Sequence, residues 1–97
     1  MKALRFIRPA EMELLDAARY YEMHAPGLGD DFLDKIDLAI RDLREHPEGW
    51  PIVRFSIRRR LIQRFPYALL YRVDPDEITV LATMHLRRHP DYWLDRV

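Results

Sequence analysis

The chain has 97 residues, of which 16 are Lys or Arg and 16 are Asp or Glu, so its formal net charge is zero. This length predicts one domain spanning residues 1–97, and the absence of cysteine excludes disulfides and thiolate metal sites. No apolar run approaches the ~18–20 residues that a membrane-spanning helix needs, and the N-terminus lacks the pattern of a signal peptide. We therefore expect a cytoplasmic protein with no membrane partner.

The charges are unevenly distributed along the chain. Between Trp50 and Val73 there are six arginines and no acidic residue, whereas Glu11 to Glu48 contains eleven acidic residues against four basic ones. Such asymmetry informs about partners more than about fold. The basic block predicts a landing surface for a polyanion or an acidic protein segment, and the acidic block would repel the same partner.

The first predicted elements are a strand and a helix. In residues 2–8, Leu4 and Phe6 share one face of a strand. Pro9 then suits the first turn of a helix, where its missing N–H costs nothing. The helix is predicted over residues 10–24 by an apolar stripe at i, i+3, i+4 and i+7, formed by Leu14, Ala17, Ala18 and Tyr21.

A second helix is predicted after the break at residues 26–29. Asp30 and Asp31 are expected to be its N-terminal caps, and Pro47 ends it after His46. Its apolar stripe consists of Phe32, Ile36, Ala39, Ile40 and Leu43. Because so few residues join the two helices, we expect an antiparallel helical hairpin.

The C-terminal half has the composition of short strands. Segments 58–63, 67–72 and 78–85 are rich in β-branched, aromatic and aliphatic residues, and residues 64–66 and 74–77 form the turns between them. A helical turn is predicted within residues 91–96. The expected fold is α+β with the order β-α-α-β-β-β, in which the helical hairpin packs on one face of a mostly antiparallel sheet. The other face is expected to be open to solvent and to carry the arginines at its surface or rim.

Particular residues in this order resemble those of the RelE/ParE superfamily, small bacterial toxins of type II toxin–antitoxin modules. The similar residues are Glu13, Ala17 and Ala18, the turn 27–29, Phe32-Leu33, residues 36–40 ahead of His46-Pro47, Arg59-Arg60, residues 65–73, and His85, Arg88 and Pro90. The resemblance covers nearly the whole chain. It implies a growth-inhibiting toxin that acts without a cofactor and is held inactive by a cognate antitoxin, with which it forms a hetero-oligomer.

The superfamily contains two activities, and the sequence leaves both open. RelE-like members are similar to ribosome-dependent endoribonucleases that cut messenger RNA, whereas ParE-like members bind and poison DNA gyrase. Many nuclease members carry a basic residue near the start of the strand that here begins at Tyr67. This chain has Phe65-Pro66-Tyr67-Ala68 there, a pattern associated with members whose activity is poorly defined or ParE-like.

Metal-independent RNA cleavage would need cations on the phosphate and a group that transfers protons. Arginine suits the first role because its planar fork donates two parallel hydrogen bonds, and histidine suits the second because its ordinary pKa lies near neutrality. The candidate catalytic residues are Arg59, Arg64, His85 and Arg88. The candidate residues for binding RNA or another target are Arg58, Arg60, Arg87 and Tyr92. No spacing of His24, His46 or His89 indicates a metal site.

Simpler interpretations of the same residues remain open. His85 suits a hydrogen-bonded surface position, Tyr67 and Tyr71 suit the core, and Trp93 suits a role in fixing the tail. Arg58 and Arg60 fall on one face of a strand and Arg59 on the other, so one of these faces could simply be solvated. Two further hypotheses are a non-toxic nucleic-acid-binding module and a degenerate family member that is retained only as the partner of its antitoxin.

Overall fold

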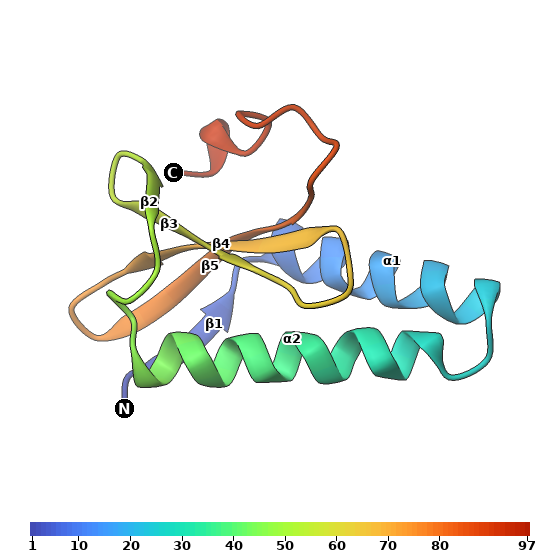
Figure 1. The fold of residues 1–97 in the computed structure, drawn as a ribbon. Helices are drawn as coiled ribbons and strands as arrows, with labels where there is room; N and C mark the ends of the chain where they lie inside the picture. Colours follow the sequence, from blue (N-terminus) through green and yellow to red (C-terminus); the bar gives the residue numbers. More distant parts are fainter.

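The computed structural model describes residues 1–97 as a five-stranded sheet with two long helices on one side (Figure 1). The elements in chain order are β1 (Ala3–Phe6), α1 (Arg8–His24), α2 (Leu28–Glu45), β2 (Ile52–Arg54), β3 (Ile57–Leu61), β4 (Tyr67–Val73), β5 (Glu77–His85) and a 3-10 turn (Leu94–Arg96). Neither helix combines the length and apolar character that crossing a membrane requires.

The sheet has the strand order β1-β5-β4-β3-β2. Only β1 and β5 run parallel. The helical hairpin leads the chain from β1 at one edge of the sheet to β2 at the other edge, and the following strands bring β5 back beside β1. The other pairs are antiparallel, as expected for strands joined by short turns. The predicted α+β class and the meander of the last three strands are confirmed. The sequence analysis missed β2, since three residues after Pro51 show too little alternation to indicate a strand.

The helical hairpin is confirmed, but α2 begins earlier than predicted. Gly27 has a φ of 87° and is the N-cap, so the prediction that Asp30 and Asp31 cap the helix is wrong. Both carboxylates lie instead in the first turn, where they favour the positive end of the helix dipole. Gly29 lets the helices approach closely, because a Cβ there would lie 2.7 Å from the carbonyl oxygen of Ala18.

The core occupies both faces of the sheet. On the helix side, Phe32, Ile36 and Leu43 of α2 pack with Leu69 and Tyr71 of β4. On the other side, residues from three strands pack with a tryptophan of the tail; this second cluster comprises Ile57, Leu70, Leu81, Ala82, Met84 and Trp93. The prediction of a solvent-open face is therefore wrong.

The second face is covered by the C-terminal segment, residues 86–97, which crosses over the sheet in Figure 1. Trp93 is only 1% exposed there. Residues 68–71 of β4 and 78–82 of β5 are buried without interruption, which is the pattern of strands that are covered on both sides. The fixing role foreseen for Trp93 is confirmed.

Candidate functional site

Arg58 and Arg60 lie on the helix side of β3, since their strand partners are Tyr71 and Leu69. Arg60 is 7% exposed; its Nη2 donates to Oδ2 of Asp42 in α2 at 2.6 Å, and its guanidinium carbon lies 4.7 Å from the ring centroid of Trp50. A second hydrogen bond joins its Nη1 to the carbonyl oxygen of Leu61. The expectation of an open, wet surface is therefore wrong for Arg60.

The half-buried Arg58 serves the loop that connects α2 to β2. Its Nη1 donates to the carbonyl oxygens of Trp50 at 2.6 Å and Glu48 at 3.1 Å. The hydroxyl of Tyr71 donates to the carbonyl oxygen of Pro47 in the same loop at 2.6 Å, and burial raises the pKa of Tyr71 to about 12. These side chains fix residues 47–50 against the sheet.

Two more arginines of the basic block have carboxylate partners. Arg54 lies 2.8 Å from Asp91, and Arg72 lies 2.8 Å from Asp74. The hydrogen bonds from Arg72 lower the pKa of the Asp74 carboxyl. Three of the six arginines between Trp50 and Val73 are thus paired with carboxylates of the same molecule, which the residue count alone does not indicate.

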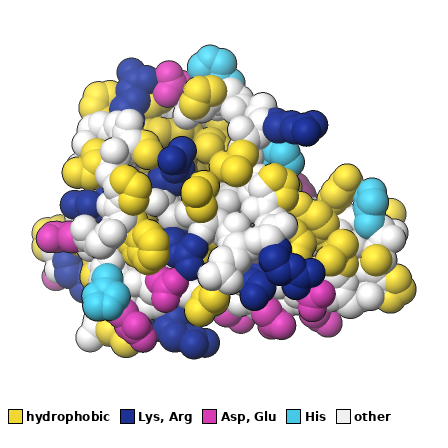
Figure 2. All heavy atoms as spheres, in the orientation of Figure 1, with side chains coloured by type: hydrophobic (Ala, Val, Ile, Leu, Met, Phe, Trp, Pro, Cys, Tyr) yellow, Lys and Arg dark blue, Asp and Glu magenta, His cyan; other side chains and the backbone are white.

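Among the arginines that follow Trp50, three keep guanidinium groups without a hydrogen-bonded or ionic partner: Arg59, Arg64 and Arg87. Arg59 pairs with Leu70 in the sheet and so points to the face opposite Arg60. Arg64 lies in the bend after β3 with a φ of 71°, and Arg87 follows β5. Pro66 accepts a hydrogen bond from the N–H of Leu86, so these last two lie at the same end of the sheet. Figure 2 shows Lys and Arg as separate groups among apolar side chains, not as one continuous basic surface.

Glu13 of α1 is the acceptor that joins the tail to the body of the protein. Its carboxylate accepts from the N–H of Thr83 at 3.1 Å, the hydroxyl of Tyr92 at 2.6 Å and Nη1 of Arg96 at 2.8 Å. Arg88 approaches it to 3.8 Å and stacks on the Tyr92 ring at 3.9 Å from the centroid. Burial, and then the bond to Glu13, raise the pKa of Tyr92; the same carboxylate raises the pKa of Arg96.

The sequence analysis used Glu13 only as a point of resemblance and gave it no role. A signal was available, because Glu13 lies three residues after buried Ala10 and four before buried Ala17. A carboxylate on the buried stripe of a helix needs partners in the folded chain. The partners themselves come from sequence positions 70 to 83 residues away, which no local pattern indicates.

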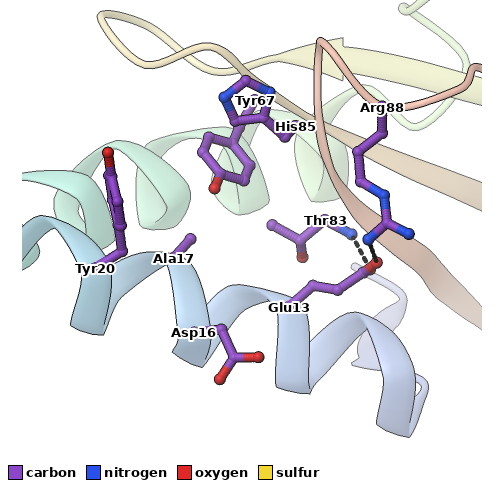
Figure 3. Close-up of a pocket in the computed structure, with 8 residues that line it drawn as sticks. All are labelled: Glu13, Asp16, Ala17, Tyr20, Tyr67, Thr83, His85 and Arg88. Carbon is purple, nitrogen blue, oxygen red and sulfur yellow. Dashed lines mark hydrogen bonds and ion pairs between the residues drawn. The ribbon is translucent and has the colours of Figure 1, made fainter.

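A pocket of about 240 Å³ lies between α1 and the ends of β4 and β5 (Figure 3). Its lining residues are Glu13, Asp16, Ala17, Tyr20, Tyr67, Thr83, His85 and Arg88. The His85 ring stands edge-on to Tyr67 with centroids 5.0 Å apart, and its Nδ1 accepts the N–H of Arg87. That bond places the proton of the neutral ring on Nε2. Burial is the main cause that raises the pKa of Tyr67.

The predicted site residues therefore separate into three groups. His85 and Arg88 line the pocket, with Tyr92 stacked against Arg88; Arg58 and Arg60 support the opposite end of the helix-side face; Arg59, Arg64 and Arg87 have free guanidinium groups. No three His, Asp or Glu side chains lie close enough together to hold a metal ion.

Comparison with known proteins gives one family and one fold. The model of the family described as "ParE toxin of type II toxin-antitoxin system, parDE" matches residues 4–90. A solved structure, "Chromosomal ParDE TA system from P. aeruginosa", contains a chain that superposes with a TM-score of 0.78 at 21% identity, over 90% of this chain and 98% of that one. At this identity the superposition shows a shared fold. Comparison with curated protein sequences finds no significant match.

Proposed function

Because the chain belongs to the ParE family of type II toxin–antitoxin toxins, we propose that it stops growth as a protein ligand of DNA gyrase and does not cut messenger RNA. The family implies a cognate antitoxin as partner. The two activities of the superfamily differ in their target, so a choice between gyrase and messenger RNA is needed.

The choice of gyrase binding over RNA cleavage rests on one observation: candidate phosphate-binding arginines contact other side chains of the protein itself. A nuclease needs cations already aimed at the position of the scissile phosphate, because electrostatic stabilisation depends on preorganised groups. Arg60 is buried against Asp42 and Trp50, and Arg88 is held by Glu13 and Tyr92. Arg60 is therefore not free to converge with Arg59 on a phosphate, and Arg88 is drawn towards Glu13 and Tyr92.

The arginines without partners suit a binding protein. Exposed guanidinium groups bind carboxylates through paired hydrogen bonds and steer association with an acidic surface. Arg59, Arg64 and Arg87 are available for this. Binding a protein surface does not require their guanidinium groups to converge on one atom. They support the recognition of an acidic protein face in the cytoplasm, where gyrase acts.

The proposed antitoxin contact uses other features of the fold. A helix and an extended segment of the antitoxin would lie on the helical hairpin and the sheet, covering the free arginines with acidic side chains while apolar anchors fill grooves. This complex is the proposed inactive hetero-oligomer.

Two assays on purified protein test the proposal. In the first, we expect inhibition of DNA supercoiling by gyrase in proportion to toxin concentration. In the second, translating ribosomes with a defined messenger should show no toxin-dependent cleavage at codons. Cleaved messenger together with unaffected supercoiling would overturn the proposal in favour of RNA cleavage. Normal growth on inducible expression without the antitoxin would instead favour the nucleic-acid-binding module or the degenerate partner.

A further inference from the structure

The turn between β2 and β3 holds a phenylalanine in an unfavourable backbone conformation. Arg54 and Ile57 are paired, so Phe55 and Ser56 form a two-residue loop. Phe55 has a φ of 53° and is 69% exposed. A left-handed conformation costs a bulky residue roughly 1–2 kcal/mol, whereas glycine adopts it freely and is common in such turns. The backbone alone would favour glycine, so the ring must have another use.

Phe55 belongs to a small apolar surface, which we call the hairpin tip: Ile52, Val53 and Phe55. Ile52 is 55% exposed and Val53 41% exposed. Isolated apolar side chains are ordinary on protein surfaces, but here three exposed apolar side chains lie within four residues at a projecting turn. In Figure 1 this turn extends away from the helices, on the side of the sheet where the tail lies.

The hairpin tip is held in position by its surroundings. Arg54 pairs with Asp91 of the tail at 2.8 Å, and its guanidinium carbon lies 5.2 Å from the centroid of the Phe55 ring. At the base of the hairpin, the N–H of Arg59 donates to the carbonyl oxygen of Pro51 at 3.0 Å. An exposed aromatic side chain that is already oriented loses little entropy on binding.

These observations favour a protein as the occupant over a nucleic acid. A base would stack on the Phe55 ring, but Arg54 lies beside that ring and its charge is already balanced by Asp91. Ile52 and Val53 contribute aliphatic surface, which phosphates and sugars do not use. Asp91 balances the charge of Arg54, but Arg59, whose N–H bonds to Pro51 at the base of the hairpin, has no ionic partner and is complementary to an acidic side chain. Aromatic side chains that fill a partner's pocket are the usual centres of binding energy in protein interfaces.

We propose that the hairpin tip is the insertion anchor of the toxin, with Phe55 entering an apolar pocket with an acidic rim on the protein that it inhibits. This inference rests on the proposed function, since it requires a protein target. A folded target can offer a concave pocket for a projecting turn. An antitoxin segment that lies across grooves cannot, which is why we assign the tip to the target.

The test compares Phe55→Gly with Met23→Ala. The glycine removes the ring and suits the positive φ, so thermal unfolding should remain unchanged or move upward. Met23 is 81% exposed on α1 and serves as an apolar control away from the hairpin. We expect Phe55→Gly to weaken the affinity for purified gyrase roughly 10–100-fold, Met23→Ala to leave it unchanged, and Phe55→Tyr to retain most of it. Binding of the cognate antitoxin should be the same for Phe55→Gly, Phe55→Tyr and the wild type.

Several results would overturn the inference. One is that Phe55→Gly binds gyrase with wild-type affinity. The others are that Phe55→Gly loses antitoxin binding equally, that it changes the oligomeric state, or that it loses RNA binding instead of gyrase binding. Growth arrest in cells separates the two proposals. If wild-type protein fails to bind gyrase, the proposed target is wrong. Loss of arrest in Phe55→Gly, with arrest retained in Met23→Ala, would still support the anchor for a different protein target.

Discussion

Arg59 and Arg60 are neighbours in β3 but meet opposite surroundings. Arg60 points towards the helices, where it is 7% exposed and bound to Asp42 and Trp50, whereas Arg59 points to the other face and has no ionic partner. The alternation of a strand is enough to produce this difference. It teaches that a run of arginines is not one surface, because one member can support the fold while the next remains free to bind.

The largest expected effect is on Arg60. In Arg60→Ala the Asp42 carboxylate would lose its partner and Trp50 its covering cation, so we expect the free energy of unfolding to fall by about 3 kcal/mol. Arg59→Ala should change it by less than ~0.5 kcal/mol. Urea unfolding of both variants measures the difference. Equal losses of stability would mean that the two arginines are not distinguished by their faces of the sheet.

Alkaline unfolding tests the same side of the sheet through Tyr71. Its folded-state pKa is raised to about 12 from an ordinary value of 10.0, so the folded protein favours the protonated hydroxyl. The resulting stability is fully present below pH 10 and is lost as the pH rises towards 12, by roughly 2 kcal/mol. Tyr71→Phe should be less stable at pH 8, because the bond to Pro47 is absent, and should lose less stability between pH 10 and 12. Parallel pH curves for the two proteins would contradict this prediction.

Glu13 allows a similar comparison between α1 and the tail. Glu13→Gln would leave the half-buried Arg96 without an ionic partner, so we expect a loss of about 1–2 kcal/mol, concentrated in the C-terminal segment. Hydrogen exchange of residues 92–96 should accelerate. Glu11→Gln is the matched control, because its pair with Arg8 is exposed and contributes about 0–1 kcal/mol. Unchanged exchange in Glu13→Gln would show that the bonds to Glu13 are not needed to hold the tail.

The smallest effect on stability is expected for the free arginines, whose changes should appear in function. Arg59→Ala should leave the melting temperature within about 3 °C and weaken the inhibition of gyrase supercoiling roughly 10-fold, since one unpaired charge is removed from the interface. Arg41→Ala in α2 is the control, because Arg41 is exposed and, like Arg59, has no ionic partner. Equal inhibition by both variants would remove Arg59 from the proposed interface.

Local sequence patterns predicted much of the architecture. The helical stripes, the turn at residues 74–77 and the apolar runs of β4 and β5 predicted these elements, because each depends on neighbours within a few residues. The structure differs from the prediction where an element does not follow such a local pattern. β2 is short and follows a proline, and Gly27 caps α2 in place of the more usual aspartates. For the candidate site, the sequence identified residue types but not their partners.

The sequence by itself determined the order of elements other than β2, the helical hairpin and the placing of Arg58 and Arg60 on one strand face with Arg59 on the other. Only the tertiary structure decided what covers each face: Asp42 and Trp50 reach Arg60 from one side, and Trp93 closes the opposite side. The physical reason is that hydrogen bonds within an element depend on local spacing, whereas the burial of a charge depends on groups brought from distant positions in the chain. The bond from Tyr92 to Glu13, across 79 positions, is the plainest example.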